Sequence, residues 1–206
     1  MREVDPKQTS RAMAFEMWMK APMPMLTFLK KMDVTKVVKV AKKRGCKLNS
    51  LMCWCIGKAA TTVKEFYLLP VGDKLMEFDK IAVSAVIATK EGGITSCDVP
   101  FCENFEEFNK QYLEISGRAR ETGERTMLGD EYMVVGTSAV VKTTLDGVIN
   151  LYSGIFNNPF VVWGKYENKW FKKTLTLSFQ FHHTQMDGGH ASQYLINLQE
   201  VFNSLK

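Results

Sequence analysis

The sequence lacks the features of disulfide-rich, membrane-spanning and zinc-binding proteins. Its five cysteines are an odd number without a C-x-x-C pair, so neither a disulfide framework nor a zinc motif is predicted. No apolar run approaches the roughly 18 residues of a membrane span, and the first six residues, MREVDP, are polar. We therefore expect neither a membrane anchor nor a signal peptide. Reduced thiols suit the cytoplasm, which is the expected location.

The excess of positive charge is small, at +5. Much of it falls on Lys30, Lys31 and the segment 36–44, where valine and alanine occupy the other faces of a predicted helix. No aromatic residue interleaves these basic residues, so a solvated helix face is favoured over a nucleic-acid-binding patch. No nucleic-acid partner is expected.

Histidine is the scarcest titratable residue, and its three copies fall within the segment 182–190. A neutral imidazole is the usual proton acceptor near neutral pH, because its unperturbed pKa is about 6.5. Three interpretations compete: a core histidine bonded to the backbone, a general base, and a metal site built from His182, His183, Asp187 and His190. Adjacent strand residues point to opposite faces, so His182 and His183 cannot easily share one ion. No metal is therefore expected.

The segment before the histidines has the pattern of a half-buried strand. Residues 173–183 read KTLTLSFQFHH, in which apolar and polar side chains alternate. If the alternation continues, His183 shares the apolar face with Phe181, while His182 points to the other face. We therefore expect His183 to be the buried or cleft-facing imidazole. The glycine pair after Asp187 ends the strand, and a final helix follows.

Residues 183–188 form an H-x-x-x-D-G motif about twenty residues before the end of the chain. The motif resembles the signature of CoA-dependent acyltransferases, and its position resembles the chloramphenicol acetyltransferase family in particular. Residues 136–139, Gly-Thr-Ser-Ala, are similar to the family's Asn-x-Ser-Ala stretch. Residues 164–166, Gly-Lys-Tyr, resemble a strand whose Lys-Tyr pair contacts CoA. Arg11 with residues 15–18, Phe-Glu-Met-Trp, resembles the family's Arg-Arg-x-x-Phe-Glu-Phe-Tyr.

This resemblance implies a fold and a reaction. The fold is a mixed β-sheet packed with helices, formed as a single domain over residues 1–206. The reaction is direct transfer of the acetyl group of acetyl-CoA, a co-substrate, to a hydroxyl of a small molecule, with no bound cofactor. His183 would be the general base, and the Ser138 hydroxyl would bond to the oxyanion. Asp187 would pair with Arg11 and so keep His183 in position.

The resemblance also implies partners. Lys165 and Tyr166 would contact CoA, and the chain would form a homotrimer with active sites at the subunit interfaces. The acceptor would be chloramphenicol or a related hydroxylated molecule, with antibiotic resistance as the outcome.

Simpler roles fit the same residues when they are taken without the resemblance. Ser138 fits an ordinary serine at a strand end, and Asp187 fits a turn-forming aspartate before glycine. Lys165 and Tyr166 fit a solvated strand end.

The sequence departs from the family mainly on the acceptor side. Val140-Val141-Lys142 stands where the family commonly has Leu-Pro-Trp, and Val162 replaces a threonine that positions a water. Met17-Trp18 replaces the Phe-Tyr of the acceptor pocket, and Ala88 replaces another pocket aromatic. A hydrophobic pocket discriminates by shape, at roughly 1–3 kcal/mol per methylene. The acceptor itself therefore does not follow from the sequence.

Two other functions remain open at this point. A dihydrolipoyl acyltransferase core carries the same motif, although no lipoyl or subunit-binding domain precedes this one. The chain could also be a non-catalytic acyl-CoA-binding or assembly protein that kept the scaffold. Release of CoA from acetyl-CoA in the presence of an acceptor would distinguish an enzyme from such a protein.

Periodicity and capping signals predict an α/β protein with a mixed sheet and helices packed on it. The predicted helices are 10–20, 35–44, 49–66, 104–123 and the final segment. Asn104 is expected to cap the start of the fourth, and Gly45 to close the end of the second. The predicted strands are 80–89, 132–141, 150–155, 160–166 and 174–183.

Overall fold

The computed structural model describes all 206 residues of the chain. Its α-helices are α1 (Ala12–Trp18), α2 (Thr35–Arg44), α3 (Leu48–Ala60), α4 (Phe105–Thr122) and α5 (Gly188–Ser204). Two short 3₁₀ helices are η1 (Pro6–Gln8) and η2 (Lys64–Tyr67). The strands are β1 (Arg2–Glu3), β2 (Met25–Asp33), β3 (Leu68–Val71), β4 (Lys74–Glu77), β5 (Lys80–Ala88), β6 (Ile94–Pro100), β7 (Tyr132–Val140), β8 (Phe160–Gly164), β9 (Glu167–Lys169) and β10 (Lys172–His182).

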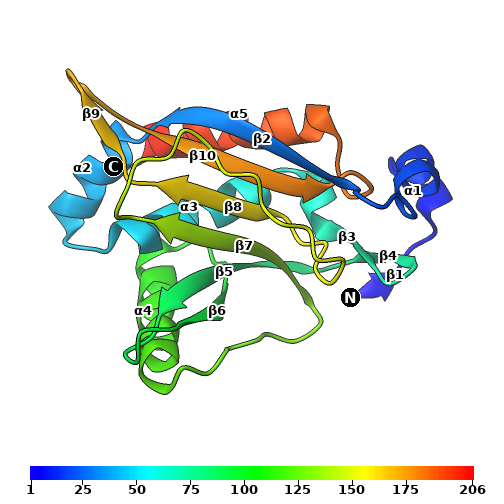
Figure 1. Cartoon of the computed structure of the whole chain (residues 1–206), viewed down its shortest axis with the longest axis horizontal. Helices are drawn as coiled ribbons and strands as arrows, with labels where there is room; N and C mark the ends of the chain where they lie inside the picture. The colour runs from blue at the N-terminus through cyan, green and yellow to red at the C-terminus, as the bar shows by residue number, and fades with distance from the viewer.

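The main sheet is mixed and has seven strands. Six of them follow the order β2-β10-β8-β7-β5-β6, and β9 pairs with β10 beyond this path (Figure 1). The pairs β5–β7 and β7–β8 are parallel, whereas β10 is antiparallel to both β2 and β8. A small second sheet has the order β1-β4-β3 and lies beside α1. The predicted mixed sheet packed with helices is confirmed.

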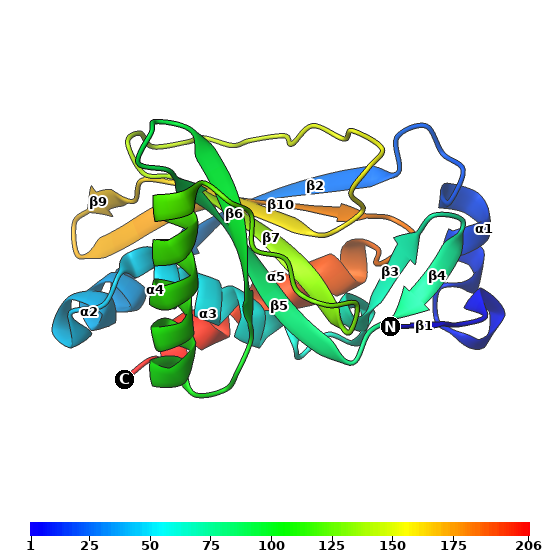
Figure 2. The same cartoon turned by 90° about the horizontal axis from the view of Figure 1, so that it is seen from below.

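The helices α2, α3 and α5 lie together on one side of the sheet (Figure 2). The odd-numbered residues of β10 face them, as the alternating pattern predicts, and Phe179 and Phe181 are fully buried. The ring centroid of Phe179 lies 4.6 Å from that of Tyr194 on α5 and 6.0 Å from that of Phe66 on η2. These rings belong to one hydrophobic cluster of 43 buried residues. Burial of each such aromatic side chain stabilises the fold by about 1.5–3 kcal/mol.

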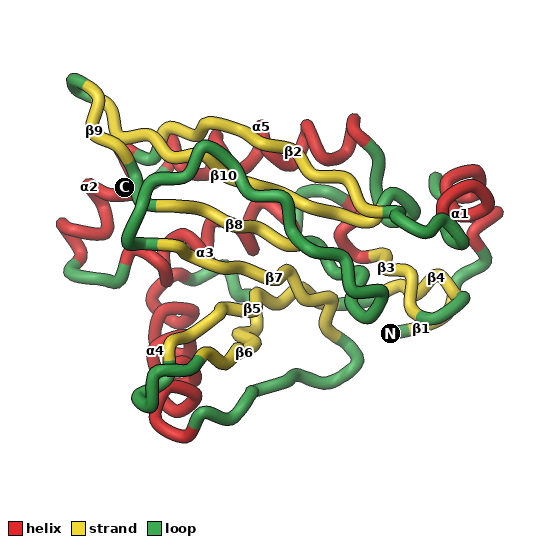
Figure 3. The backbone as a smooth tube through the Cα atoms, in the orientation of Figure 1, coloured by secondary structure: helices red, strands yellow, loops and turns green.

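The other side of the sheet is crossed by the long connection between β7 and β8, residues 141–159 (Figure 3). The even-numbered residues of β10 bond to it: the Ser178 hydroxyl donates to the carbonyl of Val148, and the Gln180 amide donates to the carbonyl of Asn150 at 2.9 Å. The prediction of a strand at 150–155 is therefore wrong. This segment binds the sheet through single side-chain contacts and has no strand partner.

Other boundaries differ for local reasons. The predicted helix 49–66 ends at Ala60, and a separate turn, η2, follows. The strands β2 and β6 were not predicted, because neither shows a clear alternation of apolar and polar residues. Two predicted helix ends are present as expected: Asn104 caps α4 by accepting from the backbone N–H of Glu107 at 2.9 Å, and Gly45 ends α2 with a φ of 63°. None of the helices is both long and apolar enough to cross a membrane.

Candidate active site

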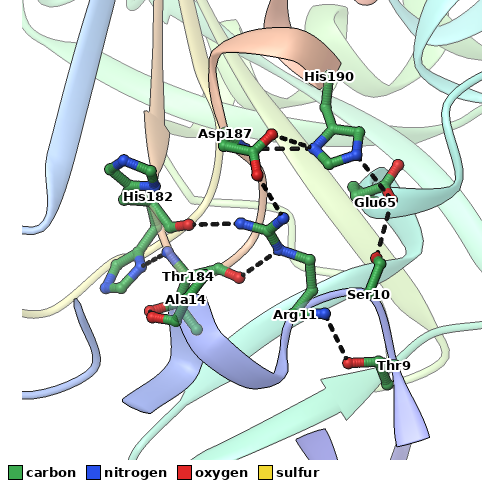
Figure 4. Close-up of polar contacts among 10 residues, drawn as sticks. Thr9, Ser10, Arg11, Ala14, Glu65, His182, Thr184, Asp187 and His190 are labelled. Atoms are coloured by element: carbon green, nitrogen blue, oxygen red, sulfur yellow. Dashed lines mark hydrogen bonds and ion pairs between the residues drawn. The ribbon is translucent and has the colours of Figure 1, made fainter. Parts of the chain in front are cut away.

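Arg11 holds the turn that carries the histidine motif. Its side chain is 1% exposed, and its guanidinium donates three hydrogen bonds to that turn (Figure 4). These bonds reach the carbonyl of Thr184 at 3.0 Å, the carbonyl of His183 at 2.9 Å and Oδ2 of Asp187 at 2.8 Å. The structure thus contains the predicted Arg11–Asp187 pair. It also shows that the same guanidinium fixes the backbone of His183 directly.

Further hydrogen bonds fix the entry to this turn. The backbone N–H of His183 donates to the carbonyl of Pro24 at 2.8 Å, which ties the turn to the start of β2. The side-chain amide of Gln185 donates to the carbonyl of Leu68 at 2.6 Å, which ties the turn to β3. Three elements that are distant in sequence therefore hold one short loop, and the His183 backbone has little freedom.

The strand ends at His182, one residue earlier than the alternation suggests. His182 is the deeply buried imidazole, at 2% exposure, whereas His183 is half-buried. Of the two alternatives expected for His183, a buried or a cleft-facing imidazole, the first is therefore wrong. Burial, together with the smaller effect of the neighbouring His183, lowers the pKa of His182 to about 4. His182 is thus neutral near neutral pH, and its Nδ1 accepts the backbone N–H of Thr184 at 3.0 Å.

The His183 ring stacks on Trp18, the last residue of α1. The ring centroids lie 4.7 Å apart and the planes are inclined by 8°. Nδ1 of His183 is buried without a hydrogen-bond partner, while Nε2 has no protein partner and is not enclosed. The ring is therefore fixed on one side, and its free nitrogen is open to a ligand. The sequence marked Trp18 only as a pocket residue, not as the support of this imidazole.

Asp187 is ionised at neutral pH. Partial burial alone would raise the pKa of its carboxyl, but the hydrogen bond and charge of Arg11 lower it overall. The imidazoles of His190 and His183 add to this lowering. A carboxylate held in this way acts as an anchor and not as a proton carrier.

Ser138 lies far from this cluster within one chain. Ser138 pairs with Val162 across β7 and β8, and Val162 pairs with Ser178 across β8 and β10. Ser178 precedes His183 by five residues along β10. Two steps of about 4.8 Å between strands and five of about 3.3 Å along one separate the Cα atoms of Ser138 and His183 by roughly 20 Å. The pairing places Val162 beside Ser138.

Lys165 and Tyr166 follow β8, toward the Ser138 end of the sheet. The half-buried Tyr166 ring lines an open pocket of about 250 Å³ with side chains of α2 and of the turn after it. The other lining residues are Val38, Ala41, Lys42, Gly45, Cys46 and Leu48. Lys165 is exposed and borders a different cavity of about 20 Å³, which has room for about one water. The candidate residues thus form two groups, one around His183 and one around Ser138.

No set of three or more histidine, cysteine, aspartate or glutamate side chains is arranged to hold an ion.

The chain matches the family model described as chloramphenicol acetyltransferase over residues 1–199. It belongs to that family. Chloramphenicol acetyltransferase 3 of Escherichia coli is 24% identical over 181 residues, which cover 84% of each chain. This acetyltransferase relative, together with the family match, shows that the chain is an acyltransferase.

Solved structures show the same fold. A structure described as chloramphenicol acetyltransferase superposes with a TM-score of 0.84 at 18% identity and covers 100% of this chain and 99% of its own. The dihydrolipoamide acetyltransferase of Azotobacter vinelandii superposes with a TM-score of 0.70 at 15% identity and covers 94% and 86%. The chain therefore shares its fold with both of these acetyltransferases.

Arg11→Lys should destabilise this acetyltransferase. A lysine ammonium has no planar fork, so at least one carbonyl of the turn loses its donor. We expect the free energy of unfolding to fall by about 2–4 kcal/mol, measured by urea denaturation. Arg44→Lys is the matched control, because Arg44 pairs with Glu106 at the surface and should change stability by less than about 0.5 kcal/mol. Equal losses in the two variants would contradict the role given to Arg11.

His182 should make the stability of the acetyltransferase depend on pH. Its folded-state pKa of about 4 lies below the ordinary 6.5, so in acid the unfolded chain binds a proton that the folded chain does not. The free energy of unfolding should therefore fall by about 3 kcal/mol as the pH falls from about 6.5 to 4. His182→Asn keeps an acceptor for the N–H of Thr184 and should remove this contribution to the slope of unfolding free energy against pH. An unchanged slope in the variant would show that another group titrates.

Proposed function

We propose that the chain transfers the acetyl group of acetyl-CoA to a hydroxyl of a small molecule, with His183 as the general base. The observation that supports this most is the presentation of the His183 imidazole. Trp18 and the Arg11-held backbone fix the ring, and Nε2 is left without a protein partner. A neutral imidazole held in this way can accept the proton of a bound hydroxyl.

The reaction balances with one proton and no cofactor. Nε2 of His183 takes the acceptor's hydroxyl proton as the oxygen attacks the thioester carbon. The new C–O bond gives a tetrahedral intermediate whose oxyanion accepts a hydrogen bond from the Ser138 hydroxyl. The C–S bond then breaks, and His183 returns the proton to the CoA sulfur. No acyl-enzyme forms, because neither residue becomes acetylated.

We infer that a second copy of the chain completes the site. His183 and Ser138 lie roughly 20 Å apart within one chain, too far to act on one carbonyl. The chain also exposes large apolar side chains on residues 141–159, including Ile149 at 78%, Leu151 at 90% and Ile155 at 74%. An apolar surface of this kind is typical of a protein–protein interface. These side chains support a homotrimer in which His183 of one subunit meets Ser138 of the next.

We propose that the Tyr166 pocket holds part of CoA. It is mostly apolar, and Lys42 at its rim and the exposed Lys165 nearby can pair with the phosphates of CoA. The five cysteines are all free, which fits a reducing compartment, and we propose the cytoplasm.

The acceptor side of the site is apolar and rich in methionine. Met13, Met17 and Met23 lie on or after α1, near Trp18, and are 72%, 54% and 59% exposed. Methionine adapts to the shape of a ligand, so an aromatic or aliphatic alcohol such as chloramphenicol or a related molecule suits this surface.

The test is CoA release from acetyl-CoA, followed with a thiol reagent, against chloramphenicol, other alcohols and dihydrolipoamide. Acetylation of an alcohol supports the proposal. Release with dihydrolipoamide alone would instead favour a dihydrolipoyl acyltransferase. No release with any acceptor, despite acetyl-CoA binding, would favour a non-catalytic acyl-CoA-binding protein.

A further inference from the structure

His190, the third residue of α5, lies between two carboxylates (Figure 4). Its Nδ1 lies 2.7 Å from Oδ1 of Asp187, and its Nε2 lies 3.2 Å from Oε1 of Glu65 on η2. The second oxygen of Asp187, Oδ2, accepts the bond from Arg11. Glu65 Oε1 also accepts the hydroxyl of Ser10, the residue before Arg11, at 3.2 Å. The contacts therefore form a closed ring that joins α1, η2 and the start of α5.

The ring fits the doubly protonated form of His190. A carboxylate only accepts hydrogen bonds, so each contact needs an N–H, and only an imidazolium has two. The backbone N–H of Asp187 also donates to Nδ1 at 3.3 Å, a hydrogen bond that requires the neutral form with Nδ1 unprotonated. That form, however, would leave two acceptors, Nδ1 and Oδ1, facing each other at 2.7 Å.

The charges around His190 favour the same form. The Glu65 side chain is 13% exposed, and His190 is the only basic side chain within 4 Å of it. A carboxylate so far removed from water needs a cationic partner. A cation in the first turn of a helix is unfavourable by itself, so the two carboxylates must outweigh the dipole of α5. The charged groups facing this ring are Asp187, Glu65 and, through Asp187, Arg11, and the titratable His183 lies beyond Asp187.

We propose that His190, as an imidazolium bridging Asp187 and Glu65, is a positioning residue for His183. It fixes one oxygen of Asp187 while Arg11 binds the other, and Arg11 in turn holds the carbonyl of His183. The proposal rests on the proposed function only for its effect on turnover. The bridge itself can be tested without activity.

The test uses histidine-selective ¹⁵N NMR and exploits the presence of only three histidines. In the wild type near neutral pH, we expect one imidazole with both nitrogens protonated and bonded, assigned to His190 by its loss in His190→Gln. Glu65→Gln removes one carboxylate and should return this imidazole to the neutral form. The matched control is Glu103→Gln, because Glu103 pairs with Lys58 at the surface and should leave the spectrum unchanged.

Stability and kinetics provide the second measurement. His190→Gln leaves Glu65 without a cation, so the double variant His190→Gln/Glu65→Gln should melt at a higher temperature than His190→Gln alone. His190→Gln and Glu65→Gln should each lower kcat about tenfold, because His183 is displaced slightly. Both variants should leave the KM for acetyl-CoA unchanged, because the proposed CoA contacts are not altered.

The proposal is overturned if His190 is neutral in the wild type, or if Glu65→Gln leaves both the imidazole signal and kcat unchanged. If the wild type shows no acetyl transfer at all, the proposed function fails. The NMR signal and the melting temperatures then still decide whether the bridge exists.

Discussion

His183→Ala should lower kcat for acetyl transfer by about 10²–10⁴-fold, because the acceptor hydroxyl loses the base that takes its proton. Binding of acetyl-CoA should be retained, since the proposed CoA contact at Tyr166 lies toward the Ser138 end of the sheet and not beside His183. Steady-state CoA release gives kcat, and calorimetry gives the dissociation constant for acetyl-CoA. His183→Gln should lose as much, because an amide of similar size cannot accept and return the proton.

A second comparison separates chemistry from folding. Arg11 donates a hydrogen bond to the backbone carbonyl of residue 183, and this carbonyl is still present in His183→Ala. The melting temperature of His183→Ala should therefore stay closer to the wild type than that of Arg11→Lys. Loss of turnover in proportion to loss of folded protein would contradict the role of His183 as base.

Ser138→Ala should lower kcat by about 10²–10³-fold, because the oxyanion of the tetrahedral intermediate loses a preplaced donor. The KM for acetyl-CoA should change little, since the bond forms only as the negative charge develops. Ser116→Ala is a suitable control, because Ser116 is a serine of α4, and α4 packs mainly on β6 and α3. A rise in KM without a fall in kcat would show that Ser138 binds substrate and does not stabilise the transition state.

The sequence predicted the elements that have strong local signals. The alternation along residues 173–183 identified β10 and the face that packs on α5, and Asn104 and Gly45 marked helix ends through their own backbone requirements. The contact between Arg11 and Asp187 followed from the resemblance to a family, because nothing local links residues 176 positions apart.

Other features depend on tertiary packing and could not be read from the sequence. The apolar residues of the segment 150–155 suggested a strand, but a strand also needs a free partner edge, and here the segment lies across the sheet. The alternation left His183 either buried or cleft-facing, and the structure contradicts the first alternative because β10 ends one residue earlier, at His182. Glu65 and Trp18 carried no signal of their contacts with His190 and His183, since folding alone brings them together.

The division of the candidate residues into two groups is the central claim, and mixed oligomers test it most directly. His183→Ala and Ser138→Ala chains carrying different tags are co-expressed, and oligomers containing both tags are purified and assayed for CoA release. If each site of a trimer joins His183 of one subunit to Ser138 of the next, every trimer that contains both variants has one intact site in three. The purified mixed trimers should then recover about a third of wild-type activity.

The control mixture pairs His183→Ala with Asp187→Ala, whose lesions lie in the same group, and it should recover nothing. Recovery by the His183→Ala and Ser138→Ala mixture alone is the predicted result. Activity of that mixture no higher than that of the separate variants would contradict an active site shared between chains.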